Sequence, residues 1–474
     1  MFIGRDAELR MLEDAYRSAK SELVIVYGRR RIGKSALIRK FAENKPHAML
    51  FEALEQEHTD VQLMHFSTQL ARYLAEPLLK DASFKDWEQA FDYLTRHAIQ
   101  QNRGKEKRII ALDELQWMAA GKNTLVGLLK YYWDNHWKQA NCMLILCGSI
   151  SSFMIRHVIR SKALYGRAGL ELNVKGLYPY EARRLFNTGV SDEDALKYLL
   201  IFGGVPKYLE ELSPHKSFNQ NMNALCFSKN GVMVNEPAKI FHSQFRQPGT
   251  YVKILKHIVD RGYCTAKEVG LHNGIPSGGG LSGYLENLLH ADIIMSCAPF
   301  GKPRSSKLVR YGLADEFLHF YFKYMEPHRD LAALSRTARV FETVTKSGFD
   351  SWLGFSFERF CRKHAGHLAD IMGFSDTVAW AGPHFGKTDR HFQIDLLYKR
   401  TDNVITLCEI KHVNSALSPT VIPAVESKKK LLSIPRGYTV QTALICLYGP
   451  DNALEHSRYF DHIVTLKDIF GEIK

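Results

Sequence analysis

The sequence lacks the patterns of a secreted or membrane-spanning chain. No basic segment followed by an apolar one opens it, and its apolar runs, such as residues 23–27 and 142–147, are too short to cross a bilayer. Its eight cysteines include no CxxC pair and lie mostly inside apolar runs, which predicts reduced, buried thiols. We therefore expect a cytoplasmic protein without membrane contact.

The composition is that of an ordinary folded chain with an excess of positive charge. Its 474 residues suffice for about three domains. The formal net charge of +13 favours a polyanionic partner, and DNA is the partner that we expect. The excess is uneven, because residues 350–474 hold 15 Lys and Arg against 14 Asp and Glu. DNA would therefore be gathered mainly by the preceding part of the chain.

The pattern of residues 23–40 predicts a strand, a phosphate loop and a helix, in that order. The apolar run leads into a GxxxxGK[ST] motif, in which backbone N–H groups and a helix N-terminus surround an anion. Lys34 would reach the β- and γ-phosphates of ATP, and the Ser35 hydroxyl would bind Mg²⁺. The predicted nucleotide-binding residues of the loop are Gly28, Arg29, Arg30, Arg31, Ile32, Gly33, Lys34, Ser35 and Ala36. Three arginines exceed the need of one nucleotide, so we expect at least one of them to pack against an acid or a neighbouring domain.

A second apolar run, residues 109–112, ends in two carboxylates that suit a Mg²⁺·ATP site opposite the loop. Asp113 would hold the metal through water, and Glu114 would orient or deprotonate the attacking water. The apolar run 142–147 is followed by Ser149, a candidate sensor of the γ-phosphate.

Arg167 follows a predicted helix and precedes the predicted strand 170–174. An arginine there could stabilise phosphate charge in its own site or in that of a neighbouring subunit. The alternative is a surface arginine without a catalytic role.

Together these motifs resemble the archaeal and bacterial AAA+ family ATPases related to the STAND NTPases. The resemblance rests on residues 2–5, 27–35, 112–116, 146–149, 165–167 and 203–209. It implies an α/β ATPase core, a helical lid that carries a Gly-Gly-Val-Pro turn, and often a winged helix. It also implies that Arg5 lies near the adenine, that Arg167 is the finger or sensor arginine, and that the protein assembles into a ring or another oligomer. The lid departs from the pattern in having no clear second sensor arginine, and Lys207 is its nearest cation.

Residues 249–330 predict three short helices, the last one led by glycines, and then two short strands. This order resembles a winged helix-turn-helix. The two predicted strands, residues 293–295 and 308–311, flank a group of cations with no acid among them, and these charges suit DNA phosphates: Lys302, Arg304, Lys307 and Arg310. Winged helices also dock on proteins, so a protein partner is the alternative.

The last 127 residues or so, from about residue 348, predict an amphipathic helix with Glu358, a strand with Asp395, and a hairpin partner with Glu409 and Lys411. A helix over 423–432 follows and bears three consecutive lysines. The order resembles the PD-(D/E)XK nuclease superfamily. In that chemistry Asp395 and Glu409 bind Mg²⁺, Glu358 supports the metal or its waters, and Lys411 positions or activates the attacking water. The alternative is a surface hairpin with solvated charges.

We therefore predict an α/β protein with a P-loop AAA+ core (residues 1–175), a helical lid (176–248), a winged helix (249–330), a linker (331–347) and a restriction-endonuclease-like domain (348–474). The predicted function is ATP hydrolysis directed to DNA, with a Mg²⁺-dependent endonuclease-like domain; ATP and Mg²⁺ are the cofactors, and DNA and further copies of the chain are the partners. One alternative is a nucleotide-switched regulator that binds DNA or protein and does not cut. Another is a signalling ATPase whose target is a protein.

Overall fold

The computed structural model describes residues 2–80, 83–100, 106–120, 124–149, 151–186, 189–245, 247–276, 278–303, 305–334, 339–387 and 391–472. The chain divides into two compact units, Met1–Gly176 and Leu177–Lys474. In the described ranges, no helix has the length and apolar character needed to span a bilayer. All eight cysteines are buried free thiols, which confirms the prediction from their sequence context.

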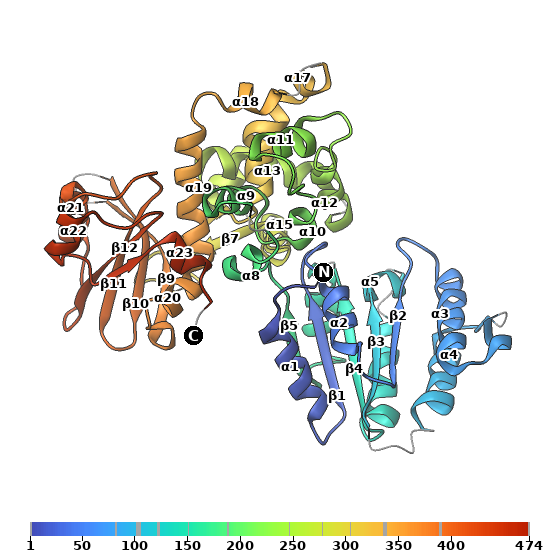
Figure 1. Ribbon diagram of the computed structural model, residues 1–474. Helices are drawn as coiled ribbons and strands as arrows, with labels where there is room; N and C mark the ends of the chain where they lie inside the picture. The colour runs from blue at the N-terminus through green and yellow to red at the C-terminus, as the bar shows by residue number, and fades with distance from the viewer. Residues whose placement is uncertain are drawn as a thin grey trace. The chain divides into compact units, whose positions relative to one another are not determined.

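The first unit is built on a five-stranded parallel sheet with the order β2-β3-β4-β1-β5 (Figure 1). Its strands are β1 Glu22–Tyr27, β2 Ala48–Glu52, β3 Arg108–Asp113, β4 Cys142–Gly148 and β5 Ala168–Asn173. Its α-helices in the described ranges are α1 Asp6–Arg17, α2 Lys34–Ala42, α3 Thr59–Leu74, α4 Trp87–Leu94, α5 Leu115–Met118, α6 Thr124–Tyr132 and α7 Ser151–Phe153. The central strands β1 and β4 are apolar without alternation because both faces of a parallel sheet are covered.

The second unit begins with helices and a small sheet. The helices are α8 Pro179–Arg183, α9 Asp192–Phe202, α10 Pro206–Leu209, α11 Phe218–Met222, α12 Glu236–Gln244, α13 Pro248–Arg261, α14 Ala266–Asn273 and α15 Gly279–His290. Strands β6 Tyr263–Thr265, β7 Ile294–Cys297 and β8 Arg310–Leu313 form an antiparallel sheet in the order β6-β8-β7. Thr265 begins α14 through a capping box, since its N–H donates to Glu268 at 2.7 Å and its hydroxyl accepts from the Glu268 N–H.

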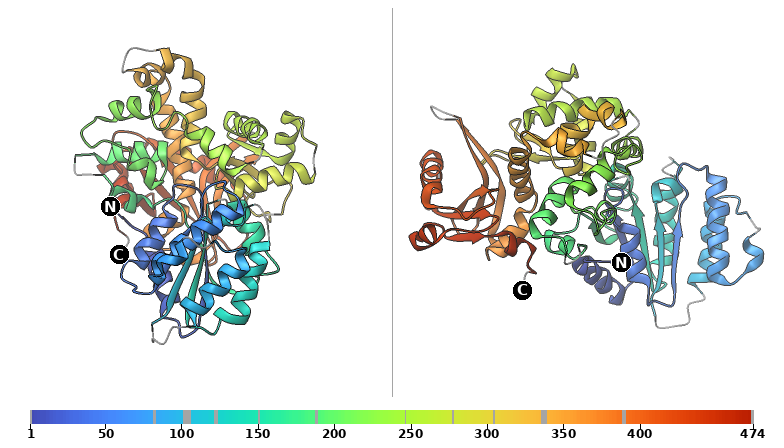
Figure 2. Two further views of the ribbon diagram at one scale, coloured as in Figure 1. Left: turned by 90° about the vertical axis from the view of Figure 1, so that its right-hand side faces the viewer. Right: turned by 45° about the horizontal axis from the view of Figure 1, so that its top comes forward.

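The rest of the second unit combines helices with a mixed five-stranded sheet of order β13-β12-β11-β10-β9. The helices are α16 Glu316–Phe320, α17 Arg329–Leu334, α18 Val340–Thr345, α19 Phe349–Lys363, α20 Ala365–Ile371, α21 Ile422–Leu431, α22 Asn452–Ser457 and α23 Leu466–Phe470. The strands are β9 Val378–Lys387, β10 His391–Arg400, β11 Val404–Lys411, β12 Thr439–Cys446 and β13 His462–Val464. Antiparallel pairing of β10 with β11 confirms the predicted hairpin. The sheet lies between α19 on one face and α21 on the other (Figure 2).

Candidate functional site

The strand ends that the sequence singles out lie side by side. β1 and β3 both pair with β4 in parallel, so the carboxyl ends of the three strands meet at one edge of the sheet. The phosphate loop leaves β1 at this edge, Asp113 ends β3, and Ser149 follows β4. Burial, and next the charge of Asp113, raise the pKa of the Cys147 thiol on β4, whereas the ammonium of Lys34 lowers it. Asp113 at the end of β3 and Lys34 after β1 therefore both lie near Cys147 on β4.

Glycines allow the backbone conformation of the phosphate loop, residues 28–35, and the lysine of the loop hydrogen-bonds to its backbone. Gly28 and Gly33 have φ angles of 152° and 93°, which favour glycine. Lys34 is 5% exposed, and its Nζ donates to the Arg29 carbonyl oxygen at 3.0 Å. A phosphate in the loop would offer this ammonium a charged acceptor in place of a neutral one, and such hydrogen bonds are the stronger kind.

We expect Gly28→Ala to weaken ATP binding at least about tenfold and to lower the free energy of unfolding by about 1–3 kcal/mol. A Cβ at Gly28 would lie 2.3 Å from the Val174 carbonyl oxygen, and that atom is backbone. The control is Gly127→Ala on α6, where a Cβ meets nothing within 4 Å and alanine favours the helix. Nucleotide titration and thermal unfolding measure both effects. Equal behaviour of the two variants would contradict the prediction.

Two arginines near the loop make defined contacts. Arg30 donates from two nitrogens to the two carboxylate oxygens of Glu55, at 3.1 and 2.9 Å, which confirms that one loop arginine packs against an acid. Arg5 is 3% exposed and donates to the carbonyl oxygens of Ile32 in the loop and Lys175 after β5, at 3.0 and 2.5 Å. Arg5 therefore ties the loop to the end of the unit. Its location near the adenine stays a prediction.

Glu114 is held by the predicted sensor and by a residue to which the sequence assigned no role. Its Oε2 accepts a hydrogen bond from the Ser149 hydroxyl at 2.6 Å and another from the Gln116 side-chain amide. Gln116 also donates to the Ser149 oxygen at 3.1 Å. A displacement of Ser149 would therefore act directly on Glu114. Gln116 lies within the motif 112–116 that supports the family resemblance, and this was its only signal in the sequence.

Arg167 lies at the opposite end of the sheet from the phosphate loop. β5 runs parallel to β1 with Asn173 opposite Tyr27, so Arg167 precedes the amino end of β5 while the loop follows the carboxyl end of β1. The length of β1 separates the two by roughly 15 Å or more. The Arg167 guanidinium donates to both carboxylate oxygens of Asp134 at 2.8 and 2.9 Å, and this pairing lowers the pKa of Asp134. The register therefore places Arg167 far from the phosphate loop of its own chain, which does not favour the alternative in which Arg167 acts at that loop.

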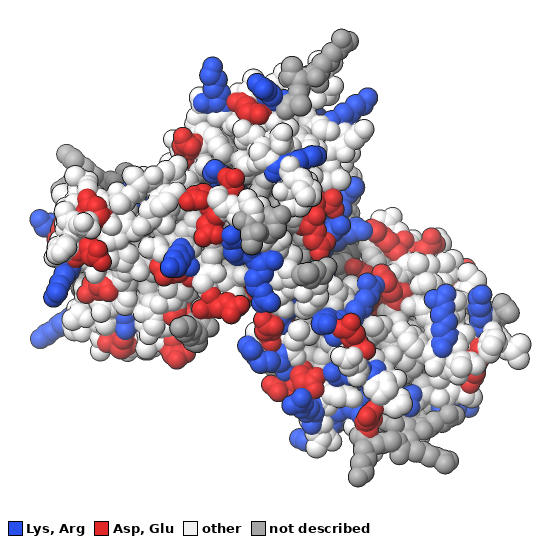
Figure 3. Space-filling view, viewed as in Figure 1, with Lys and Arg blue, Asp and Glu red and all other residues white. Residues whose placement is uncertain are grey.

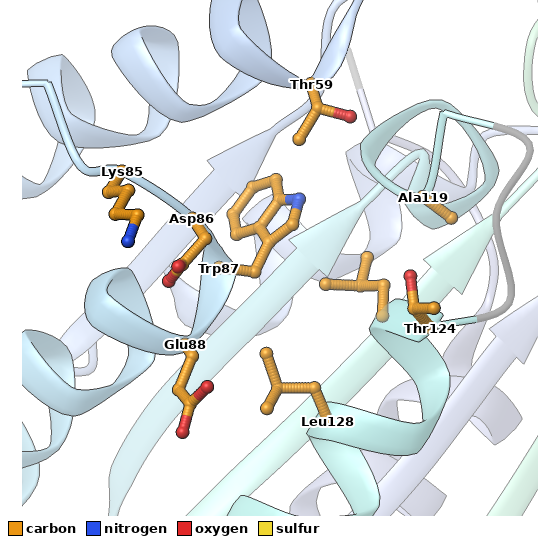
Figure 4. A pocket seen from close by; sticks show the side chains of 9 residues that line it. Thr59, Lys85, Asp86, Trp87, Glu88, Ala119, Thr124 and Leu128 are labelled. Carbon is orange, nitrogen blue, oxygen red and sulfur yellow. The ribbon is translucent and has the colours of Figure 1, made fainter.

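A separate pocket of about 360 Å³ lies in the first unit between α4 and α6 (Figure 4). The side chains that line it are Thr59, Lys85, Asp86, Trp87, Glu88, Ala119, Thr124, Leu125 and Leu128. None of the site residues predicted from the sequence is among them. Asp86 accepts a hydrogen bond from the Gln89 N–H at 2.9 Å and so caps α4, which gives this acid a structural role.

A second set of polar side chains lies on the C-terminal sheet, and two of these side chains, Glu409 and Lys411, come from β11. Ile405 and Leu407 on β11 pack in one hydrophobic cluster with Val425 of α21. Because side chains alternate along a strand, Glu409 and Lys411 lie on the same face, toward α21.

Asp395 lies on the same face of the sheet, because Leu397, two residues further along β10, packs in the same hydrophobic cluster. Relative to β9, β10 holds one extra residue between Ile394 and Leu397, which is a bulge that includes Asp395. The β10–β11 register brings Asp395 beside Glu409. Glu358 on α19 is the third acid: burial first, and then the charge of Asp395, raise the pKa of Glu358 to about 7.

An ammonium contacts both strand carboxylates. Lys428 on α21 donates to Glu409 Oε2 at 2.7 Å and lies 3.5 Å from Asp395 Oδ2. The Lys411 ammonium lies 2.8 Å from Glu409 Oε1, close enough for ion pairing but without hydrogen-bond alignment. Burial by itself lowers the pKa of Lys428, but Asp395 and Glu409 outweigh it and the net shift is upward. We call Glu358, Asp395, Glu409, Lys411 and Lys428 the carboxylate–lysine cluster.

This cluster has the donors of a magnesium site but not the arrangement of one. Carboxylate oxygens are the ligands that Mg²⁺ prefers. Over the part of the chain that the structure describes, however, no three His, Cys, Asp or Glu side chains are placed so that they could hold a metal. Lys428 contacts the oxygens that such a metal would need. As arranged here, the cluster does not fit Mg²⁺.

The cations predicted to bind DNA are not equivalent. Lys302 and Lys307 are exposed in the connection between β7 and β8. The Arg310 guanidinium on β8 lies 5.2 Å from the centre of the Phe385 ring on β9. Arg304 lies outside the described residues. Basic and acidic side chains are interspersed over the face of the molecule drawn in Figure 3.

Comparisons with known proteins agree with a nucleotide-binding site at the phosphate loop. Residues 2–212 match a family described as an ATPase domain predominantly from Archaea. Over 367 residues the chain is 29% identical to an uncharacterized protein of Methanocaldococcus jannaschii, with 77% of each chain covered. Over 45 residues it is 53% identical to an uncharacterized ATP-binding protein of the same organism, covering 10% of this chain and 76% of the relative. Among solved structures, a Walker-type ATPase of Pyrococcus abyssi is 20% identical with a TM-score of 0.51, covering 68% of this chain and 96% of that chain, a similarity of fold.

Proposed function

Since residues 2–212 belong to the family of ATPase domains found predominantly in Archaea, we propose that this chain couples ATP hydrolysis to an action on DNA. The observation that carries the proposal is the convergence of the phosphate loop, Asp113, Glu114 and Ser149 at one edge of a parallel sheet. Lys34 binds the β- and γ-phosphates, and Glu114 orients or deprotonates the attacking water. Ser149 senses the γ-phosphate through its hydrogen bond to Glu114.

The residues at this edge fit a magnesium ion. Ser35 lies in the first turn of α2 and Asp113 ends β3, and hydroxyl and carboxylate oxygens are hard ligands of the kind that Mg²⁺ takes. When bound with ATP, Mg²⁺ neutralises charge on the phosphates. Ser35 and Asp113 would hold it, and Lys34 and the loop N–H groups would hold the phosphates.

The position of Arg167 supports assembly of several copies of the chain. In the proposed AAA+ arrangement, Arg167 acts as a finger on the ATP of a neighbouring subunit, because it lies far from its own. Its side chain keeps 28% of its surface exposed beside Asp134, so a neighbour can reach it. The helical lid of residues 176–248 belongs to the same proposal.

The C-terminal region, residues 348–474, is proposed to be a nuclease-like domain of the PD-(D/E)XK type. The order α19, α20, β9, β10, β11, α21, β12 supports the fold. The ion pairs that join Asp395, Glu409 and the two lysines, and the effect of the Asp395 charge on Glu358, support it as well. Because the cluster does not fit Mg²⁺ as arranged, no cleavage step through a metal is derived. Lys428 favours the alternative function, a nucleotide-switched regulator whose nuclease-like domain binds without cutting.

Residues 249–330 are proposed to be a winged helix that places DNA. The order α13, β6, α14, α15, β7, β8 supports it, and the connection 298–309 supplies the wing. Phe300 in this connection packs against Trp380 and His384 of β9, with ring centres 5.5 and 5.7 Å apart. The proposed wing is therefore anchored to the proposed nuclease-like sheet, and its exposed lysines would bring DNA to that sheet.

We expect the double variant Lys302→Ala/Lys307→Ala to bind DNA more weakly and with a smaller salt dependence. Each DNA phosphate that a lysine no longer neutralises reduces the slope of log K against log salt by about 0.9, so the slope falls by about 2. Binding is measured by fluorescence anisotropy with labelled duplex DNA over a range of salt concentrations, and cleavage of the same DNA with Mg²⁺ is followed on gels.

The matched control is Lys229→Ala/Lys467→Ala, which removes two exposed lysines from other parts of the same unit. If both double variants bind DNA equally weakly, the wing is not the DNA-binding surface, and if wild-type protein binds no DNA, the proposed partner is wrong. Cleavage that Asp395→Ala abolishes would support the nuclease. Binding without cleavage would support the regulator.

A further inference from the structure

We infer that Lys428 supplies the positive charge that a divalent cation would supply between Asp395 and Glu409, so that the carboxylate–lysine cluster excludes metal until this lysine moves away. The inference rests on the proposal that the cluster is a nuclease-like site. It adds a control of metal access that nothing in the sequence motif implies.

The geometry of Lys428 is that of a bridging cation. Its Nζ contacts one oxygen of Glu409 at 2.7 Å and one oxygen of Asp395 at 3.5 Å, and these carboxylates come from adjacent strands. A divalent metal bound by the same two acids would need the space between the same two oxygens. An ammonium and a metal therefore cannot occupy this position together.

Burial makes the contact more than a surface ion pair. Glu409 is 1% exposed and Asp395 is 8% exposed, and the Lys428 side chain keeps 21% of its surface accessible. Two neighbouring carboxylates at this depth need a compensating charge, since an uncompensated buried charge is strongly unfavourable. Lys428 provides that charge from a different element, α21.

The local charge is already balanced. Besides Lys428, the cations that the described part of the chain places in contact with the three acids are Lys411 at Glu409 and Arg362 at Glu358, the latter at 3.5 Å. Three cations thus face three acids, and Glu358, whose pKa is raised to about 7, carries only part of a negative charge near neutral pH. A divalent ion added to this set would leave at least two excess positive charges in a partly buried site, which Coulomb repulsion opposes. Removal of Lys428 would leave the acids with a net negative charge that attracts a metal.

The Lys428 side chain is partly exposed to solvent. Lys428 lies in the last turn of α21, and its partially exposed ammonium can exchange its carboxylate contacts for a phosphate of bound DNA. That exchange would free the two acids at the moment when the substrate class of a nuclease is present. The cluster would then be closed to metal without DNA and open with it.

The test is Mn²⁺ binding by the full-length chain without nucleotide, measured by electron paramagnetic resonance. We expect Lys428→Met to bind Mn²⁺ at least about tenfold more tightly than wild type, and the double variant Lys428→Met/Asp395→Asn to lose that gain. Lys430→Met, an exposed lysine on the same helix, is the matched control and should behave as wild type. Every variant keeps the phosphate loop, so any binding there cancels in the comparison. Lys428→Gln replaces Lys428→Met if circular dichroism shows the latter to be unfolded.

Wild-type protein that binds Mn²⁺ as tightly as Lys428→Met, at a site that Asp395→Asn removes, would overturn the inference. DNA cleavage is scored separately. A gain of Mn²⁺ binding with no cleavage by any variant keeps the inference and rejects the nuclease. Mg²⁺-dependent cleavage by wild type, with no change of Mn²⁺ affinity in Lys428→Met, keeps the nuclease and rejects the inference.

Discussion

Glu114→Gln should bind ATP with the affinity of the wild-type chain and turn it over about 10²- to 10⁴-fold more slowly. The amide has the shape of the carboxylate, and its carbonyl oxygen can still accept the hydrogen bond that Ser149 donates at 2.6 Å. It cannot accept a proton from water, and it presents only one acceptor oxygen. Phosphate release under saturating ATP measures turnover, and equilibrium titration with a fluorescent ATP analogue measures binding.

The matched control for this variant is Glu106→Gln. Glu106 is exposed and precedes the amino end of β3, so the same chemical change is made at the other end of the strand that carries Asp113. We expect it to leave turnover unchanged. If Glu114→Gln also retains turnover, Glu114 is not the residue that activates water, and another group must be sought at the same sheet edge.

Arg167→Ala should also bind ATP normally and lose turnover, by about 10³-fold, if the residue is a finger for a neighbouring subunit. The register of β5 against β1 places Arg167 far from the phosphate loop of its own chain, and its side chain keeps 28% of its surface exposed. Lys34→Ala should fail for a different reason, because it removes the charge that binds the phosphates. Both variants alone are expected to be inactive.

Mixing the two inactive variants distinguishes an intersubunit role from a structural one. In a mixed oligomer, an Arg167→Ala subunit offers an intact phosphate loop, and its Lys34→Ala neighbour offers an intact arginine, so turnover should partly return. The control is Lys162→Ala, which removes an exposed cation from the same loop and should remain active. Inactive mixtures would show that Arg167 acts through its ion pair with Asp134 within one chain.

Local sequence patterns predicted the parts of this protein whose residues are close along the chain. The phosphate loop is one continuous segment, and the strand, glycines, lysine and helix that build it need no distant partner for their order. The hairpin of β10 and β11 was predictable for the same reason, because two strands joined by a short turn pair with each other. Glu409 and Lys411 share a face because they stand two residues apart on one strand.

Such local patterns could not predict which segments that are distant along the chain contact one another. Lys428 follows the buried Val425 by three residues and Lys429 follows it by four, so helical spacing alone does not choose which lysine meets the carboxylates. The choice depends on how α21 packs on the sheet. Gln116 likewise gained a role only when β4 carried Ser149 next to the end of β3.

The sequence by itself determined the chemistry available to this protein: a phosphate loop with its lysine, two carboxylates after a strand, and a set of acids and lysines near the C-terminus. Only the tertiary structure decided which of these groups meet. The strand order places Glu114 at the same sheet edge as the phosphate loop, and the pairing of β5 with β1 places Arg167 at the opposite end of the sheet. The packing of α21 on the sheet places Lys428 in contact with Asp395 and Glu409. The physical reason is that a charge acts over a few ångströms of space, whereas a sequence records distance along the chain.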